Sequence, residues 1–370
     1  MKKKILIVCD KNPCTSFGRL SLDFQEALKS SEFSSNILWL ETPEYFPNGV
    51  SDGEDSLKAK SLSIGFFTYK KPFRLYLKQK TPDIVLFIRP ELGFLCPIAK
   101  KTLPDSKTIV MVHDTFAETL YPNSLKFKIL NKFFINPTKT ADTYIYNSHY
   151  TEQESNAFFG APKIPGTIVG CPISKGFLEP FESISPDSKK LFWERFGIKN
   201  FNAVCLNISL DEPRKNLKTF FQLAKEKPEL AFVRVGRLRK ETHEMIQAMN
   251  LKNLFHFENL EFSILRDFYR NASVFIYPSF LEGFGLPPLE ALASKIPVIS
   301  SKTSALEENL NGIVPLITPP DNIKECINTL DLILSGKIHI NQEQKNALLN
   351  RFSPESFAEK FLTYLRKIFL

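Results

Sequence analysis

The feature that most constrains the fold is the regular return of short, almost continuously apolar runs along the whole chain. Val, Ile, Leu and Phe fill these runs without strict alternation, and longer helix-compatible segments separate them. The runs cover 4–9, 36–40, 84–88, 108–113, 143–147 and 167–170, then 202–209, 230–236, 255–258, 273–278, 297–300 and 313–318. Such runs are typical of parallel strands buried on both faces, and their alternation with helices indicates doubly wound α/β sheets.

The length of 370 residues favours two such domains rather than one. A turn-rich segment at 171–176 and a polar one at 182–189 lie between the two sets of runs. We therefore expect a first Rossmann-like domain over residues 1–175 and a second over residues 176–353. The last residues, 354–370, carry Phe, Leu and Ile at helical spacing, which predicts an amphipathic terminal helix.

Several classes of protein are disfavoured by the composition. No uncharged apolar run reaches 18 residues, so no transmembrane helix is expected. The apolar run after the first three lysines is too short for a signal peptide. The six cysteines are scattered without a C-x-x-C pair, which argues against a zinc site or a disulfide framework and fits a reducing cytoplasm. The chain has no D-x-D triplet, so we expect no metal and no cofactor.

The net charge of +8 is concentrated between Lys58 and Lys80, where seven Lys or Arg residues occur with no Asp or Glu. Aromatic residues are interleaved with these cations, which suits either an anionic membrane surface or an ordinary solvated face. A second stretch of this kind contains Lys126, Lys128 and Lys132 among Leu125, Phe127, Ile129, Phe133 and Phe134. No nucleic-acid-binding module is recognisable, and the charge is modest for that role, so we expect no nucleic-acid partner.

Ligands of doubly wound sheets bind beyond the carboxyl ends of the strands. A turn of this kind runs from Glu282 to Glu290, between the predicted strand 273–278 and a helix. Gly283 and Gly285 permit positive φ and a close approach of a ligand to the backbone. The N–H groups at the helix start form an anion site suited to a diphosphate, and the two carboxylates can accept hydrogen bonds from sugar hydroxyls. The alternative is a plain turn whose glutamates favour the helix N-terminus.

The stretch from Tyr277 to Glu290 closely resembles the E-x7-E motif of the retaining glycosyltransferases of family 4. The likeness continues through residues 291–301 and reaches Glu308. Members of that family have the GT-B fold, in which two Rossmann-like domains face a cleft and a C-terminal helix crosses back to the first domain. The resemblance implies the same fold here.

The resemblance also implies roles for the residues of the turn. Glu282 would contact the donor sugar, and Glu290 would bind the ribose of a sugar nucleotide. Phosphate and sugar would be held by the turn between them, formed by Gly283, Phe284, Gly285 and Leu286.

A second resemblance to the family lies in the P-R-K-N loop that follows the predicted strand 202–209. Adjacent Arg and Lys side chains can neutralise a diphosphate, although basic pairs are usually solvated surface. By the resemblance, Arg214 and Lys215 would stabilise the departing nucleotide diphosphate. The family usually has Gly-Arg where this chain has Ile208-Ser209, so Ser209 lies on the donor side and one expected phosphate-binding arginine is missing.

Three residues of the first half match the family less closely. His113 ends the run 108–113 and corresponds to an active-site histidine that faces the donor sugar. Gly18 stands where the family has a glycine-rich loop near phosphate and acceptor, but only one glycine is present. Ser148 fits a strand-end serine of the family, and a helix N-cap explains it equally well.

Two further departures lie in the second half. Lys295 replaces the usual glycine of an A-x-G-x-P turn, and Glu307 stands where a proline is common. Neither position is expected to touch the reacting centre.

The resemblance implies a retaining, metal-independent hexosyltransferase. We expect it to move a hexose from a GDP- or UDP-sugar to a glycan or lipid-linked acceptor in cell-envelope polysaccharide or lipopolysaccharide synthesis. The protein would be cytoplasmic, with peripheral association at the inner face of the membrane as an option. Two alternatives stay open: a nucleotide-sugar-binding protein with weak or no transfer activity, and a GT-B epimerase.

Overall fold

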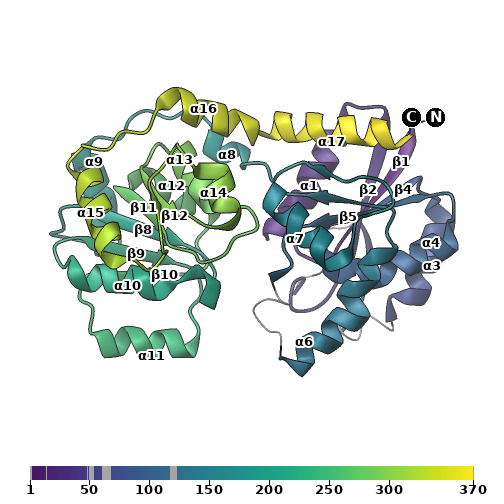
Figure 1. Cartoon of the computed structure of the whole chain (residues 1–370), viewed down its shortest axis with the longest axis horizontal. Helices are drawn as coiled ribbons and strands as arrows, with labels where there is room; N and C mark the ends of the chain where they lie inside the picture. Colours follow the sequence, from purple (N-terminus) through teal and green to yellow (C-terminus); the bar gives the residue numbers. More distant parts are fainter. Residues whose placement is uncertain are drawn as a thin grey trace. The chain divides into compact units, whose positions relative to one another are not determined.

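The computed structural model of the chain describes residues 2–13, 15–47, 49, 54–60, 68–116 and 123–369. The chain divides into two compact units, whose elements are labelled in Figure 1. Met1–Pro172 and Pro354–Leu370 form the first unit, called here the N-terminal unit. Ile173–Ser353 form the second, called the C-terminal unit.

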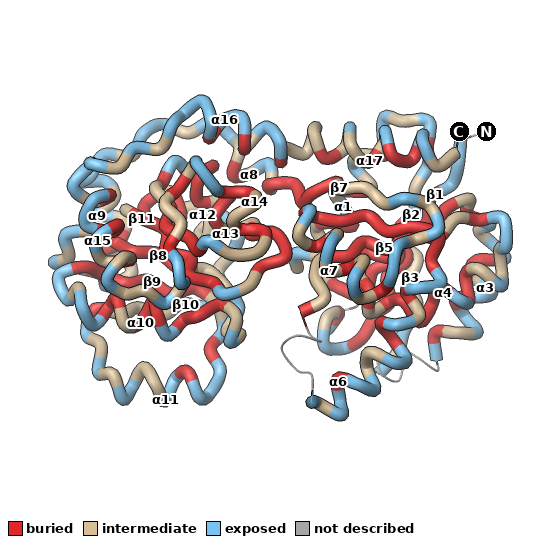
Figure 2. Tube along the Cα trace, in the orientation of Figure 1, coloured by how far each residue is buried: buried red, intermediate tan, exposed pale blue. Residues whose placement is uncertain are grey.

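In the described residues of the N-terminal unit, seven strands form one parallel sheet in the order β3-β2-β1-β4-β5-β6-β7. The central strands are buried on both faces, as the continuous apolar runs predict, and Figure 2 shows this buried layer beneath more exposed helices. The strands are β1 (Lys3–Cys9), β2 (Phe33–Glu41), β3 (Asp55–Lys58), β4 (Ile84–Phe87), β5 (Lys107–Val112), β6 (Thr143–Tyr146) and β7 (Thr167–Ile168).

Helices and helical turns connect these strands. They are α1 (Ser16–Lys29), α3 (Lys70–Lys80), η1 (Pro90–Leu95), α4 (Cys96–Thr102), α6 (Leu125–Leu130), η2 (Asn131–Ile135), η3 (Asn136–Thr140) and α7 (His149–Phe159). Strand β3 and helix α3 both lie within or beside the cationic segment that the sequence singles out. Residues 61–67 of that segment, with Phe66 and Phe67, lie outside the described residues.

The C-terminal unit has a second parallel sheet, with six strands among its described residues in the order β10-β9-β8-β11-β12-β13. Its strands are β8 (Val204–Ile208), β9 (Ala231–Val235), β10 (Leu254–Phe257), β11 (Val274–Tyr277), β12 (Val298–Ser301) and β13 (Leu316–Ile317). Its main helices are α9 (Pro186–Glu194), α10 (Leu217–Glu226), α11 (Lys240–Met249), α12 (Phe262–Asn271), α13 (Leu286–Ala293), α14 (Ser304–Leu310), α15 (Ile323–Leu334) and α16 (Gln342–Arg351), with the short turns α8 (Lys175–Leu178) and η4 (Pro213–Lys215).

Both sheets therefore have the doubly wound arrangement, in which the direction of winding reverses between two neighbouring strands. In the C-terminal unit this reversal falls between β8 and β11. The crevice beyond the carboxyl ends of strands at such a point is the usual ligand site of doubly wound sheets.

The terminal helix α17 (Pro354–Phe369) belongs to the N-terminal unit and packs on α1 (Figure 1). The ring of Phe24 lies 4.9 Å from that of Phe357 and 4.6 Å from that of Phe361, measured between centroids. Tyr364 donates a hydrogen bond of 2.9 Å to the carbonyl of Pro165. The predicted amphipathic helix thus returns to the first unit, as the family resemblance implies.

Candidate active site

The reversal of winding in the C-terminal sheet brings together two segments that the sequence analysis selected separately. The P-R-K-N loop follows β8, and the turn that starts at Glu282 follows β11, its neighbour in the sheet. Because parallel strands end at the same edge, both segments lie at the carboxyl edge of one sheet. The residues of the second half that were predicted to bind the donor therefore lie together at this edge of the sheet.

Helix α13 begins directly after the glycine turn that contains Gly285. This glycine has a φ of +95°, and a Cβ added to it would lie 2.6 Å from Cδ2 of Leu306. A side chain is thus excluded by both the backbone conformation and the contact with α14. The side-chain amide of Asn309, also on α14, donates to the carbonyl of Phe284 at 2.8 Å. Contacts from α14 thus fix the turn. Pro287 and Pro288, the second and third residues of α13, carry no N–H, so the backbone donors at this helix start are limited to the turn and Leu286.

Glu282 is the centre of a buried ion cluster and is only 5% exposed. Its carboxylate accepts hydrogen bonds from the ammonium of Lys215 at 2.7 and 2.9 Å and from Nη1 of Arg214 at 2.9 Å. The backbone N–H of Glu282 donates to Oγ of Ser304 at 2.9 Å. The two cations that sequence reasoning assigned to a diphosphate therefore lie against the glutamate that it assigned to the sugar.

The loop that carries the two cations is tied to the end of β11. The N–H of Phe280 donates to the carbonyl of Arg214 at 2.7 Å, and the amide of Asn216 donates to the carbonyl of Pro278 at 2.9 Å. The ammonium of Lys215 also donates to the hydroxyl of Tyr277 at 2.9 Å. The fold itself thus holds the cations in place, which is the condition for electrostatic preorganisation.

Burial and ion pairing act on the pKa values of this cluster in opposite directions. Burial raises the pKa of Glu282, but the charges of Lys215 and Arg214 outweigh it, and the pKa lies below its usual value. Burial lowers the pKa of Lys215, although Glu282 opposes the shift. The pKa of the Tyr277 hydroxyl is raised well above its usual value by burial and by Glu282. Glu282 is therefore ionised at neutral pH.

Glu290 lies on α13, eight residues after Glu282, and is half-buried. Its carboxylate accepts a hydrogen bond of 2.9 Å from the hydroxyl of Tyr269 on α12. A carboxylate has several acceptor positions and can accept from more than one donor.

Ser209, just after β8, points its hydroxyl at the side chain of Asn207, to which it donates at 3.2 Å. Its backbone carbonyl accepts a hydrogen bond of 2.6 Å from Nη2 of Arg234. Sequence reasoning missed Arg234, which is fully buried on β9. The one available indication is a charged residue within the otherwise apolar run Ala231–Val235.

The residues predicted in the first half lie in the N-terminal unit. His113 follows β5, and its Nε2 lies 2.9 Å from the carbonyl of Ile88. A carbonyl only accepts, so Nε2 carries the proton. Burial lowers the pKa of His113 to about 4, so the ring is neutral at pH 7. The backbone carbonyl of His113 accepts from the amide of Asn147 at 2.9 Å.

The other two residues of this unit have structural roles. A Cβ on Gly18 would lie 1.9 Å from the carbonyl oxygen of Asn12, so glycine is required for the tight connection between β1 and α1. Ser148 caps α7 by accepting from the N–H of Thr151 at 3.0 Å, which is the N-cap alternative that the sequence left open.

A pocket beside His113 includes an ion pair that the sequence analysis did not select. The guanidinium of Arg89 lies 2.9 Å from the carboxylate of Glu91. The pocket is lined by Phe17, Arg89, Pro90, Glu91, His113, Asp114, Thr115, Phe127, Ile135, Phe158 and Phe159.

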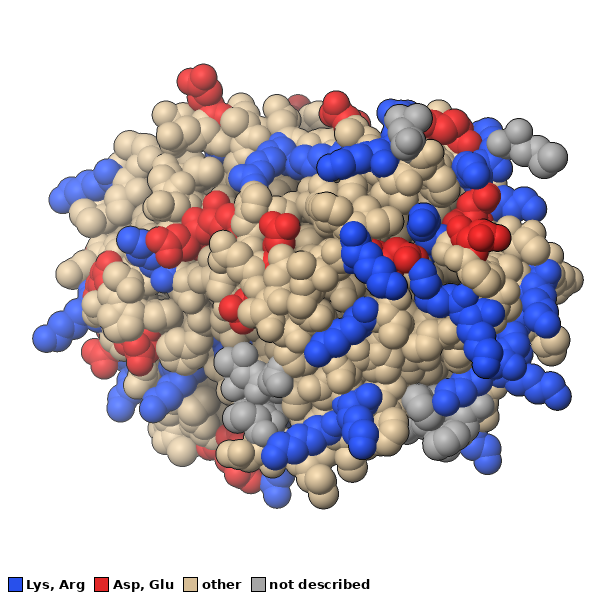
Figure 3. Space-filling view, turned by 45° about the vertical axis from the view of Figure 1, so that its right-hand side comes forward, with Lys and Arg blue, Asp and Glu red and all other residues tan. Residues whose placement is uncertain are grey.

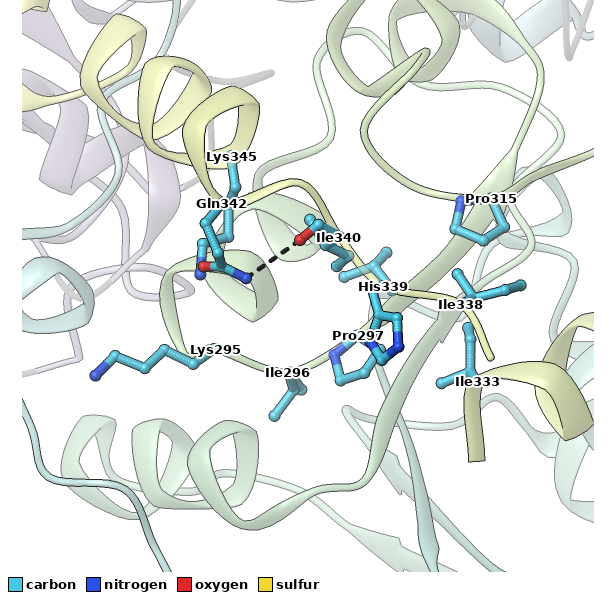
Figure 4. Close-up of a pocket in the computed structure, with 11 residues that line it drawn as sticks. Lys295, Ile296, Pro297, Pro315, Ile333, Ile338, His339, Ile340, Gln342 and Lys345 are labelled. Atoms are coloured by element: carbon cyan, nitrogen blue, oxygen red, sulfur yellow. Dashed lines mark hydrogen bonds between the residues drawn. The ribbon is translucent and has the colours of Figure 1, made fainter. Parts of the chain in front are cut away.

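Another cavity of the C-terminal unit, shown in Figure 4, lies away from the predicted site. Its lining includes Pro297 and Pro315, which immediately precede β12 and β13, so it opens at the amino edge of the sheet. Lys295, which also lines it, has a φ of +60°, a conformation that glycine adopts more readily. Its ammonium donates to the carbonyl of Phe181 at 3.0 Å.

In the part of the chain that the structure describes, no group of three or more His, Cys, Asp or Glu residues is arranged to hold a metal ion. Within the same residues, no helix has the length and apolar character needed to cross a bilayer.

Comparison with known proteins gives a class for the C-terminal unit. Residues 191–350 match the family model described as Glycosyl transferases group 1. The matched segment contains both the P-R-K-N loop and the turn from Glu282 to Glu290. These findings support glycosyltransferase activity.

Particular relatives extend the likeness over most of the chain. The chain is 26% identical over 285 residues to the O-antigen chain mannosyltransferase RfbU of Salmonella typhimurium, covering 74% of this chain and 72% of the relative. Among solved structures, sucrose-phosphate synthase from Thermosynechococcus elongatus superposes with a TM-score of 0.78 at 16% identity, covering 99% of each chain. Anabaena Alr3699/HepE in complex with UDP-glucose superposes with a TM-score of 0.75 at 14% identity, covering 98% of this chain and 99% of that one. The GT-B fold expected from the sequence is confirmed.

Proposed function

We propose that this protein transfers a hexose from a nucleotide-diphosphate sugar to a glycan or lipid-linked acceptor of cell-envelope polysaccharide, with retention of the anomeric configuration and without a metal ion. The observation that carries the proposal is the cluster of Arg214, Lys215 and Glu282 at the carboxyl edge of the sheet. It offers fixed cations for a diphosphate beside a carboxylate for sugar hydroxyls. The mannosyltransferase RfbU, which acts in O-antigen synthesis, supports the choice of sugar class and acceptor.

In the proposed reaction, the bond between the anomeric carbon and the phosphate oxygen breaks, and the diphosphate leaves with the electron pair. The acceptor oxygen bonds to the same face of the anomeric carbon, and its proton passes to the departing phosphate. Arg214, Lys215 and the backbone N–H groups of the turn before α13 stabilise the charge that develops on the diphosphate. Glu282 and Glu290 hold the sugar and the ribose.

A donor screen tests this proposal. Purified protein is incubated with UDP-, GDP- and ADP-sugars in the presence of EDTA, and both thermal stabilisation and release of the nucleotide are measured. We expect sugar nucleotides of one base to raise the thermal stability of the protein. We expect the protein to hydrolyse that donor slowly. Stabilisation without hydrolysis or transfer to any acceptor would instead favour the nucleotide-sugar-binding protein, and no stabilisation by any donor would contradict both functions.

Association with an anionic membrane surface is a second part of the proposal. Leu125, Ile129 and Phe133 follow one another at four-residue intervals along α6 and η2, and they are 73%, 51% and 44% exposed. Three lysines of the same segment, Lys126, Lys128 and Lys132, are also exposed. An apolar stripe flanked by cations suits a helix that lies in the plane of the lipid headgroups.

The segment from Lys58 to Lys80 adds cations to the N-terminal unit but is partly neutralised. Lys80 lies 3.0 Å from the carboxylate of Asp55, and Lys58 lies 3.8 Å from that of Glu41. Lys71, Arg74 and Lys78 on α3 are exposed. Figure 3, in which the N-terminal unit comes forward, shows many basic and few acidic side chains on the part drawn at the right.

Flotation with vesicles tests the membrane association. Wild-type protein should float with vesicles rich in phosphatidylglycerol at low salt and be released at high salt. The double substitution Ile129→Ser and Phe133→Ser should abolish flotation, whereas Leu191→Ser, at an exposed leucine of the C-terminal unit, should not. Absence of wild-type flotation at low salt would remove the membrane from the proposal.

A further inference from the structure

Arg234 carries a charged side chain that takes no part in the ion pairs around Glu282. It lies on β9, beside β8, and none of its surface is exposed. Of its donor groups, Nη2 bonds to the carbonyl of Ser209, while Nε and Nη1 are buried without a hydrogen-bond partner. Buried guanidinium N–H groups are almost always bonded, so two unused ones in a native site require an explanation.

The position of Arg234 connects it to the donor site. Its bond to Ser209 places the guanidinium at the carboxyl end of β8, where the loop with Arg214 and Lys215 begins. Gly236 makes room for it, because a Cβ there would lie 2.9 Å from Nη1 and 3.1 Å from Nη2. Tyr277, the partner of Lys215, is near enough to act on the charge of Arg234.

The ion pairs near Arg234 show which cations of this region have a carboxylate partner. Arg214 pairs with Glu212 and Glu282, and Lys215 pairs with Glu282. Arg239 pairs with Asp211 at 3.4 Å.

Arg234 itself has no acidic group within 4 Å among the residues that the structure describes, although Asp211 acts on it from a greater distance. The four cations thus face three carboxylates, and Arg234 is the unpaired cation of the group. Burial lowers the pKa of Arg234 to about 10, so the group is still charged at pH 7.

We propose that Arg234 binds the diphosphate of the donor, with its two unused N–H groups as hydrogen-bond donors and its charge as the net positive charge of the site. In this role it supplies, from β9, the guanidinium that is absent at Ser209, just after β8. A charged planar group with unused N–H donors on two of its nitrogens suits phosphate oxygens, which it can contact one by one. The inference rests on the proposed function, since it requires a nucleotide diphosphate as ligand.

The test compares nucleotide diphosphates with monophosphates by isothermal titration calorimetry. GDP, GMP, UDP and UMP are titrated into wild-type protein and into Arg234→Met, which removes the charge and keeps a similar length. We expect affinity for the diphosphate to fall by about tenfold or more and affinity for the monophosphate to fall by less than about threefold, because charged hydrogen bonds to the second phosphate are lost. Arg237→Met, which removes an exposed cation just beyond the same strand, is the matched control and should change neither affinity.

A diphosphate-to-monophosphate affinity ratio that is unchanged in Arg234→Met would overturn the inference, even if both affinities fall. In that case Arg234 only supports Ser209. If Arg234→Met does not fold, Arg234→Gln, whose amide can still donate to Ser209, takes its place with the same expectation. Wild-type protein that binds none of the four nucleotides, nor ADP, would refute the proposed function as well, which distinguishes the two failures.

Discussion

At the scale of single residues, the central observation is that a buried carboxylate stays charged because two cations were placed against it. Glu282 lies within 2.9 Å of both Lys215 and Arg214, which are close to it in space but 67 and 68 residues away in sequence. The motifs shared with the family identified each of the three, because each lies in a loop that follows a predicted strand. Their mutual ion pairs could not be predicted, since pairing depends on the order of β8 and β11 in the sheet.

Arg234, in contrast, could not be identified from the sequence as a residue of the site. A single charged side chain within an apolar run carries no motif, and its relation to Ser209 arises only when β9 pairs with β8. The register of two strands, rather than any local pattern, brings the two residues together.

A prediction at this scale concerns the pH dependence of stability. The pKa of His113 is about 4 in the folded chain because of burial, below the value of about 6.5 for an unperturbed histidine. Between these values the unfolded chain binds a proton that the folded chain does not. The stability due to His113 is therefore complete above pH 6.5 and is lost towards pH 4, by up to about 1.4 kcal/mol per pH unit.

Urea unfolding at pH 7, 6 and 5 measures this effect. His113→Gln, whose amide can still donate to Ile88, should lose less stability over this range than wild type. His149→Gln, at an exposed histidine, should follow wild type. Equal slopes for wild type and His113→Gln would show that His113 does not titrate as described.

At the scale of elements, the sequence predicted the positions of most strands and of the turn after β11. It did not predict β3, because Asp-Ser-Leu-Lys is too polar to stand out as a strand and is held by pairing with β2. The predicted run 313–318 becomes only the two-residue strand β13. Edge strands are thus the least predictable elements, since tertiary pairing rather than apolar content decides their length.

The rigidity of the donor turn gives a prediction for Gly285. Gly285 and Gly197 both have positive φ, but only Gly285 has a neighbour where a Cβ would lie. Gly197→Ala should cost about 1–2 kcal/mol of unfolding free energy from backbone strain alone. Gly285→Ala should cost about 1–3 kcal/mol more, because the new Cβ displaces Leu306.

Chemical denaturation of the two variants measures their losses of unfolding free energy. Gly285→Ala should also weaken nucleotide binding, whereas Gly197→Ala should not. Equal losses of stability would mean that α14 yields and that Leu306 does not fix the turn.

At the scale of the whole molecule, the N-terminal unit depends on a helix from the far end of the sequence. The rings of Phe357 and Phe361 pack on Phe24 of α1, and Arg366 forms an ion pair with Glu32 at 2.6 Å. The apolar spacing of 354–370 predicted the helix itself. Its return to the first unit followed only from the family resemblance, and its place on α1 was not predicted, because an amphipathic pattern does not specify its partner.

We predict that Phe361→Ala lowers the unfolding free energy of the N-terminal unit by about 3–5 kcal/mol and leaves the C-terminal unit unchanged. The two tryptophans separate the units, since Trp39 lies in β2 and Trp193 in α9. Variants in which one tryptophan is replaced by Phe report each unit by fluorescence during unfolding. Thr363→Ala, at an exposed position of the same helix, is the control. An equal shift of both transitions would contradict separate unfolding of the units.

The most direct test of the account is the turnover of sugar nucleotides by wild type and by Lys215→Ala. GDP-mannose, UDP-glucose, UDP-galactose and ADP-glucose are supplied with EDTA, and release of the nucleotide diphosphate is measured. We predict that wild type turns over at least one donor and that Lys215→Ala is slower by about a hundredfold or more, because a charge contact to the leaving group is lost. Lys218→Ala, at an exposed lysine of α10, should remain close to wild type. Turnover by Lys215→Ala at the wild-type rate would contradict the assignment of the ion cluster around Glu282 as the donor site.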